Sequence, residues 1–333
     1  MRKKISLKDK IFVAGSQGMV GKSIIKKLKD SGYGLSERGG KVLAPTRSEL
    51  DLLNQDLVQE WFELNQPNVV ILAAAKVGGI FANSNYPFDF ISENLKIQTN
   101  VIESSWKSGV KRFLFLGSSC IYPKIVKQPI REEALLQGAL ETTNEWYAIA
   151  KIAGIKLCQS LRIQHGFDAI SLMPTNLYGP GDNYHPSNSH VLAAMLNRYI
   201  SAKNKNLPKV TCWGTGNPMR EFLHSEDLAD ACIFALENWD PAAKNAPLDD
   251  KDEPLTILNV GTGKDISIKK LSELISELVG FEGVTEWDAS KPDGTPRKQL
   301  DISKITKLGW EPTISLKTGI KRTINELLNQ NMF

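Results

Sequence analysis

A phenol and an ammonium group stand four residues apart in the chain, at Tyr147 and Lys151. Apolar residues recur at helical spacing from about residue 145 to 165, so both side chains share one face of a predicted helix. A nearby cation favours phenolate and should lower the tyrosine pKa from about 10 toward neutrality. Such a tyrosine can exchange a proton with a carbonyl or alcohol oxygen. The spacing alone is common, and a surface pair is the competing interpretation.

A second group of reactive side chains, Ser118, Ser119 and Cys120, directly follows the predicted strand 112–116 and Gly117. Parallel sheets bind their ligands at the edge formed by the C-terminal ends of their strands. A hydroxyl at this edge can hydrogen-bond the same substrate oxygen as Tyr147. For Cys120 the bland alternative is a small buried residue, the usual state of a free cysteine.

Three glycines at positions 15, 18 and 21 follow a short apolar run, 11–14, and open a predicted helix. Glycines in this position permit a tight turn and a close approach of the backbone to a pyrophosphate. The N-terminus of the helix then offers free N–H groups and a partial positive charge to the anion. The pattern predicts nucleotide binding, and a purely structural turn is the alternative.

The end of the predicted strand 41–44 indicates which dinucleotide binds. An NAD site usually has an acidic residue here that holds the ribose 2′-hydroxyl. This chain has Arg47, whose guanidinium can pair with a 2′-phosphate, followed by Glu49, which can fill the acidic role. We expect NADPH, and the arrangement in which Arg47 is only a solvated charge stays open.

Predicted strands and helices alternate through the first half of the chain. The strands are 11–14, 41–44, 69–74, 112–116 and 169–173, and helices follow Gly21 and cover 94–108 and 145–165. Continuous apolar strands that alternate with helices are typical of parallel βαβ units. The predicted fold class is therefore α/β, a Rossmann-type doubly wound parallel sheet.

After Pro174 the sequence becomes rich in loops, at 179–189, 241–254 and 290–298, with helices expected at 191–202, 225–238 and 267–279. We expect residues 1–175, completed by part of 220–260, to form the dinucleotide-binding domain. Residues 176–333 should form a smaller domain that mainly holds a second ligand.

Composition narrows the class of protein. The 333 residues are 41% hydrophobic and 23% charged, with a net charge of only +4. This balance gives no sign of nucleic acid or a membrane as the main partner. The four cysteines form no Cys-x-x-Cys pair and the four histidines no His-x-x-x-His pattern, so no metal site is expected. With no apolar signal segment at the N-terminus, we expect a cytosolic enzyme or binding protein.

The glycine turn, the serine at the strand end and Tyr-x-x-x-Lys, in this order, resemble the extended short-chain dehydrogenase/reductase superfamily over nearly the whole chain. The resemblance implies that Ser118, Tyr147 and Lys151 form a catalytic triad. It also implies that Lys151 holds the nicotinamide ribose.

Six blocks look more narrowly like the GDP-L-fucose synthase family. They are AAAKVGG at 73–79, LGSSCIYPK at 116–124, MPTNLYGP at 173–180, HPSNSH at 185–190, WGTGNPMREFLH at 213–224 and KPDGTPRK at 291–298. That family epimerises C3 and C5 of GDP-4-keto-6-deoxy-D-mannose and then reduces the C4 ketone with NADPH, in one active site. Its members are cytosolic homodimers that pair through helices of the nucleotide domain.

The resemblance assigns residues to each role. Cys120 and His190 match the acid/base pair for epimerisation. The expected NADP(H) contacts are Gly15, Ser16, Gln17, Gly18, Met19, Val20, Gly21, Arg47, Ala74, Leu116, Gly117, Ser118, Tyr147, Lys151, Pro174, Asn176, Leu177 and His190. The expected contacts to the GDP-sugar are Ser118, Ser119, Cys120, Asn176, Arg198, Trp213 and Arg220, with Asp293 or Lys298 as further candidates.

One departure and three alternatives remain. The family often has arginine where this chain has Gln17, which weakens the expected preference for NADPH. Trp213 can equally be a core residue rather than a platform for a base. A sugar-nucleotide 4,6-dehydratase or plain 4-epimerase would use the same triad, but dehydratases typically carry Asp-Glu where this chain has Ser119 and Cys120. A non-catalytic dinucleotide sensor would commonly lack the tyrosine or the lysine.

Overall fold

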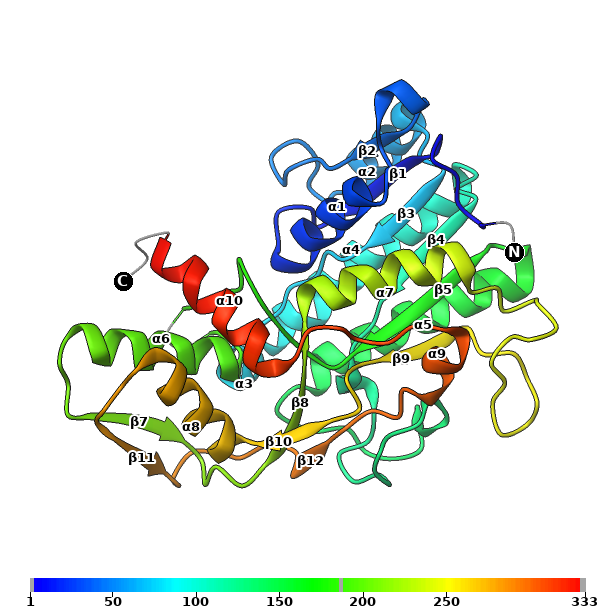
Figure 1. Ribbon diagram of the computed structural model, residues 1–333. Helices are drawn as coiled ribbons and strands as arrows, with labels where there is room; N and C mark the ends of the chain where they lie inside the picture. Colours follow the sequence, from blue (N-terminus) through cyan, green and yellow to red (C-terminus); the bar gives the residue numbers. More distant parts are fainter. Residues whose placement is uncertain (1–2, 186–187, 330–333) are drawn as a thin grey trace.

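The computed structural model describes residues 3–185 and 188–329 (Figure 1). Pro186 and Ser187 of the 185–190 block, and the ends 1–2 and 330–333 of the two expected domains, lie outside the described residues. At the centre is a parallel six-stranded sheet in the order β2-β1-β3-β4-β5-β9. Its strands are β1 (Lys10–Ala14), β2 (Lys41–Leu43), β3 (Val69–Leu72), β4 (Arg112–Leu116), β5 (Ala169–Pro174) and β9 (Ile257–Val260).

Helices cover both faces of this sheet. Helix α1 (Met19–Asp30) packs against α7 (Ser225–Asn238) on one face, in front of the strands in Figure 1. On the other face α4 (Pro87–Lys107) packs between α2 (Gln55–Asn65) and α5 (Glu145–His165). Strands β3, β4, β5 and β9 are buried along their whole length, as a sheet covered on both faces requires. The Rossmann-type α/β fold is thus confirmed.

Element boundaries agree with the sequence where the signals are strong. Helices α5 and α7 have the predicted bounds. Helix α4 begins at Pro87 rather than near residue 94, because proline at the first helical position is a start signal that the apolar spacing does not show. Strand β3 ends at Leu72, so Ala73 and Ala74 leave the sheet.

A second group of elements packs around its own apolar cluster, which includes Leu196, Tyr199, Phe222, Leu271 and Ile320. Its helices are α6 (Val191–Asn204), α8 (Ile268–Val279) and α10 (Leu316–Asn329). Its strands are β6 (Asn176–Tyr178), β7 (Lys209–Trp213), β8 (Met219–His224), β10 (Asp265–Ser267), β11 (Val284–Asp288) and β12 (Arg297–Lys298). The described residues also form two short helices, α3 (Ile80–Asn85) and α9 (Ser303–Leu308). They further include the one-turn 3₁₀ helices η1 (Ser36–Arg38), η2 (Ser119–Ile121) and η3 (Glu132–Ala134).

The loop expected over 290–298 ends in strand structure instead. Arg297 and Lys298 form β12, which pairs in parallel with β8, so that Lys298 lies beside Arg220. A strand of two residues leaves no periodic pattern in the sequence. The turn-forming and charged residues of this segment therefore predicted a loop.

The order of strands reverses between β1 and β3, and this is the switch point at which open α/β sheets bind ligands. The glycine turn occupies this point. A Cβ atom on Gly15, whose φ is +87°, would lie 2.7 Å from the amide nitrogen of Ala74. A Cβ atom on Gly21 would lie 2.1 Å from the carbonyl oxygen of Gly15, whereas one on Gly18 would meet that oxygen at 3.6 Å. The first and third glycines are therefore required by packing.

This difference predicts opposite outcomes for two alanine substitutions in one turn. Gly21→Ala forces helix α1 away from the turn and should destabilise the fold by about 1–3 kcal/mol, the usual cost of overpacking. Gly18→Ala is the matched control and should stay within about 0.5 kcal/mol of wild type. Urea unfolding of the cofactor-free protein measures both. Equal losses of stability would show that the close contact of Gly21 does not limit the fold.

Candidate active site

A cleft of about 960 Å³ runs from the glycine turn to Trp213, between the C-terminal edge of the large sheet and the second group of elements. Of the predicted site residues, all line this cleft except Leu116 and Lys151. Those two lie beneath its floor, where the Lys151 ammonium donates to the Leu116 carbonyl oxygen at 2.8 Å. The structure thus brings together residues from both halves of the chain.

The turn end of the cleft fits a dinucleotide phosphate. Helix α1 begins after Gly18 with no side-chain cap and no acidic residue in its first turn. Its first N–H groups and the positive end of its dipole therefore face the cleft without a protein anion. Gly15 and Gly21 leave no room for side chains beside them. This is the environment that a pyrophosphate requires.

Arg47 and Glu49 occupy different surroundings. The Glu49 carboxylate accepts hydrogen bonds from the amide and the hydroxyl of Thr46, at 2.7 and 2.8 Å, and these bonds lower its pKa. The Glu49 carboxylate is therefore already hydrogen-bonded within its own turn, and Glu49 does not line the cleft. Arg47 does line it, with a side chain that is 77% exposed and only loosely paired with Asp51 at 3.9 Å. After β2 the cleft therefore offers the Arg47 guanidinium, with the Asp51 carboxylate beside it, while Glu49 does not reach it.

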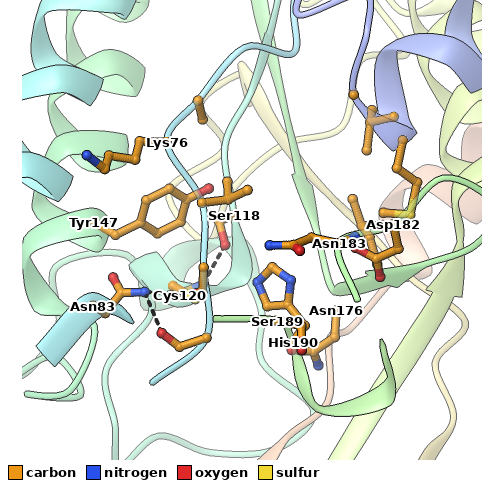
Figure 2. Close-up of a pocket in the computed structure, with 18 of the residues that line it drawn as sticks. Lys76, Asn83, Ser118, Cys120, Tyr147, Asn176, Asp182, Asn183, Ser189 and His190 are labelled. Atoms are coloured by element: carbon orange, nitrogen blue, oxygen red, sulfur yellow. Dashed lines mark hydrogen bonds between the residues drawn. The ribbon is translucent and has the colours of Figure 1, made fainter. Parts of the chain in front are cut away.

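The hydroxyl groups of the predicted triad lie near the end of β4. Ser118 caps the short helix η2, and its Oγ accepts a hydrogen bond from the Cys120 amide at 3.2 Å. The Tyr147 side chain lies near enough for Ser118 to lower the pKa of its phenol. Figure 2 shows Ser118 and Cys120 between the Tyr147 ring on one side and the His190 imidazole on the other.

The electrostatics of Tyr147 differ from the expectation. Burial raises its pKa above the ordinary value, the charge of Cys120 adds to this, and only the hydrogen bond with Ser118 lowers it. The Lys151 ammonium points to Leu116, lies 5.7 Å from the centre of the Tyr147 ring, and has its own pKa lowered to about 7 by burial. The predicted lowering of the tyrosine pKa by Lys151 was therefore wrong, because loss of hydration outweighs a distant and partly neutral amine.

Cys120 has two nitrogen neighbours. Its Sγ accepts from Asn144 Nδ2 at 3.5 Å and from Lys298 Nζ at 3.7 Å. Asn144 directly precedes α5, yet its side chain does not cap that helix and is turned to the thiol. Asparagine before a helix is a cap signal, so sequence reasoning had no ground to place Asn144 in the site.

His190 enters from the second group of elements, immediately before α6, and keeps its ring accessible in the cleft. The surrounding walls remove hydration from the ring, and together with the positive charge of Lys298 they lower the pKa of His190. The imidazole is therefore neutral near pH 7 and can accept a proton.

At the far end of the cleft Trp213 is 41% exposed, which excludes the core alternative. Its ring centre lies 5.3 Å from the Arg198 guanidinium carbon and 5.7 Å from Lys291 Nζ. Lys291, absent from the sequence-based set, is thus a second cation at this ring. The Asp293 carboxylate is held by the amide and hydroxyl of Thr215, at 2.8 and 2.7 Å.

Two further features bear on the class of protein. Within residues 3–185 and 188–329, no group of three or more His, Cys, Asp or Glu side chains is arranged to hold a metal ion. The helices of the same residues include none that is long and apolar enough to cross a membrane.

The fold and the cleft define a dinucleotide-binding α/β enzyme. The model of the NAD dependent epimerase/dehydratase family matches residues 11–248. A GDP-L-fucose synthase of Arabidopsis thaliana is 55% identical over 94% of this chain and 91% of its own length. The GDP-L-fucose synthase of Escherichia coli is 49% identical over 98% and 99%. A structure of a GDP-mannoheptose C4 reductase from Campylobacter jejuni with NADP bound, 37% identical, covers 97% of this chain and 99% of its own, with a TM-score of 0.84.

The chain therefore belongs to the GDP-L-fucose synthases of the NAD-dependent epimerase/dehydratase family.

The surroundings of Arg47 and Glu49 yield a cofactor prediction. Loss of a charge-assisted pair with phosphate costs about 1.5–3 kcal/mol. Arg47→Ala should accordingly raise the KM for NADPH at least about tenfold. Its KM for NADH, which has no 2′-phosphate, should stay nearly unchanged and serves as the internal control. Equal effects on both cofactors would remove Arg47 from recognition of the 2′-phosphate.

Proposed function

We propose that Ser118, Tyr147, Cys120 and His190 share one sugar site in this GDP-L-fucose synthase, and that they carry out its two reactions there. The enzyme converts GDP-4-keto-6-deoxy-D-mannose to GDP-L-fucose, with NADP(H) as its cofactor. The observation that supports a shared site is the hydrogen bond from the Cys120 amide to Ser118 Oγ, within a cleft that Tyr147 and His190 also line.

Epimerisation comes first in this proposal. The hydrogens on C3 and C5 flank the C4 ketone, so removal of either proton gives an enolate with its charge on the C4 oxygen. Ser118 and Tyr147 can donate hydrogen bonds to that oxygen, which is the electrostatic help that the intermediate needs. Inversion also needs one group on each face of the ring. Cys120 from the large sheet and His190 from the second group of elements provide these groups.

Reduction follows at the same C4 carbon. Bound NADPH supplies the hydride, and the C4 oxygen takes a proton from Tyr147 as the alcohol forms. The raised pKa of Tyr147 keeps its phenol protonated at neutral pH, as this donor role requires. We further propose that Lys151 holds the nicotinamide ribose.

The remaining assignments divide the two ligands between the halves of the chain. Residues 1–175, with part of 220–260, bind NADP(H), and residues 176–333 mainly hold the GDP-sugar. The glycine turn, Arg47, Ala74 and the floor around Leu116 serve the cofactor. Ser119, Asn176, Arg198, Trp213, Arg220 and Asp293 serve the GDP-sugar.

We also propose a homodimer in the cytoplasm. Helices α4 and α5 pack side by side and expose large apolar side chains, among them Phe88 at 75% and Ile163 at 87%. A second copy of the chain is the occupant that the family resemblance favours for these exposed apolar side chains. Sedimentation equilibrium measures the expected mass of two chains. All four cysteines are free, which fits a reducing compartment.

The donor role of Tyr147 predicts a selective loss. Tyr147→Phe removes the proton that the C4 oxygen needs, and general acid catalysis contributes about two to four orders of magnitude. The variant should fold and bind NADPH as wild type does, and should lose nearly all reduction of the ketone. Single-turnover oxidation of NADPH measures the loss. Retention of more than about a tenth of the wild-type rate would exclude this role.

The roles of Cys120 and His190 predict solvent exchange without hydride transfer. In deuterated water and without NADPH, wild type should incorporate deuterium at both C3 and C5. Cys120→Ser and His190→Asn should each suppress this exchange by at least about two orders of magnitude. As a control, both variants should still oxidise GDP-L-fucose with NADP⁺, a reaction that begins at C4 and needs no inversion.

Two results would contradict this account. Exchange at wild-type rates in both variants would show that another residue is the base. If wild type exchanges neither the C3 nor the C5 hydrogen, a simple ketose reductase becomes the better description.

A further inference from the structure

Lys298 places a cation beside the proposed acid/base pair. Its Nζ donates to Cys120 Sγ at 3.7 Å across 178 residues of sequence. Sequence reasoning considered it only as a contact to GDP, whereas Trp213, Arg198 and Lys291 mark the GDP end of the cleft. The described part of the chain shows no carboxylate paired with Lys298, so the charge of its ammonium acts on the cleft.

The backbone that carries Lys298 is fixed on both sides. In β12 it pairs with β8, beside Arg220. One residue further, the Gln299 amide donates to Gln128 Oε1 at 2.9 Å, and then the Leu300 amide donates to the buried Glu221 carboxylate at 2.7 Å. The lysine therefore reaches the thiol from a rigid base rather than from a mobile loop.

The other groups around Cys120 come from each element that packs there. Asn144 donates to the sulfur. The negative charge of Cys120 in its thiolate form acts on Tyr147 and Arg220 and favours the protonated form of each side chain. Glu141 lines the small space behind the thiol together with Lys298. The carboxylate of Glu141 is paired with Lys124 at 3.0 Å, which reduces its effect on the sulfur.

We propose that Lys298 is a positioning residue that stabilises the thiolate of Cys120, the form through which this side chain passes in every inversion. The same ammonium disfavours the protonated, positively charged form of His190. One cation therefore affects both Cys120 and His190, the two residues that exchange protons with the sugar. This inference rests on the proposed function, since it assigns Lys298 a part in epimerisation.

The proton balance explains why the thiolate always occurs. One residue of the pair takes the proton from C3 or C5, and the C–H electron pair moves into the enolate and onto the C4 oxygen. The other residue then gives its proton to the opposite face of the same carbon, and the ketone re-forms. One side chain gains a proton and the other loses one. Cys120 is a thiolate before this step if it is the base, and after it if it is the acid.

The first test measures the thiol itself, without substrate. Alkylation by iodoacetamide reads the thiolate of Cys120, because Cys158, Cys212 and Cys232 are buried. Lys298→Met should slow alkylation at pH 7 about tenfold, because it removes the cation that contacts the sulfur. Lys298→Arg should restore most of the wild-type profile. The matched control is Lys264→Met, an exposed lysine outside the cleft, which should behave as wild type.

The second test separates epimerisation from hydride transfer in the same variants. Lys298→Met should slow deuterium incorporation at C3 and C5 by about tenfold or more, and Lys298→Arg should recover it. Single-turnover oxidation of GDP-L-fucose by NADP⁺ should fall by a smaller factor than exchange does, so the ratio of the two rates separates epimerisation from hydride transfer. An unchanged alkylation profile in Lys298→Met overturns the proposal, even if exchange slows, because Lys298 would then act on the substrate. Absence of exchange in wild type would overturn the proposed function, while alkylation would still decide the effect of Lys298 on Cys120.

Discussion

The arrangement of the cleft depends on one buried carboxylate. Glu221, in β8, has no exposed surface, and its oxygens accept hydrogen bonds from the amides of Thr262, Gly263 and Leu300, at 2.5, 2.7 and 2.7 Å. Burial raises its pKa and these three amides lower it, so N–H groups take the place of a cation. A Cβ atom on Gly261 would lie 2.1 Å from the same carboxylate, so only glycine fits there.

This carboxylate connects three segments that are distant in sequence. It joins β8 to the loop that follows β9 in the large sheet, and to the stretch that follows β12. Arg220 and Lys298, the neighbours of these anchored residues, are thereby held against the part of the cleft that carries Ser118 and Cys120. The large sheet thus forms one wall of the cleft, and the second group of elements forms the opposite wall.

The fold was predictable from sequence because its signals are long and local. Continuous apolar strands and helices of three to six turns identify parallel βαβ units, and α5 and α7 have the predicted ends. Strands β6 to β12 were not predicted, and among them is β9, an edge strand of the large sheet. They contain two to six residues, too short a pattern to separate from loop sequence.

The contents of the cleft were largely predictable, but its electrostatics were not. Motif resemblance named residues that do line one cleft, whereas the contact between Lys298 and Cys120 spans 178 residues and has no local signature. The direction of the Tyr147 pKa shift depends on burial, which motif spacing does not measure. The side chain of Asn144 leaves its expected helix cap for the thiol, a choice that only tertiary structure determines.

The central claim is that inversion and reduction use a single sugar position. A crystal structure of the Tyr147→Phe variant with NADP⁺ and GDP-4-keto-6-deoxy-D-mannose tests it most directly. The account predicts the C4 oxygen within hydrogen-bonding distance of Ser118, with Cys120 and His190 on opposite faces of the ring. A sugar with both side chains on one face, or with its C4 oxygen away from Ser118, would contradict it.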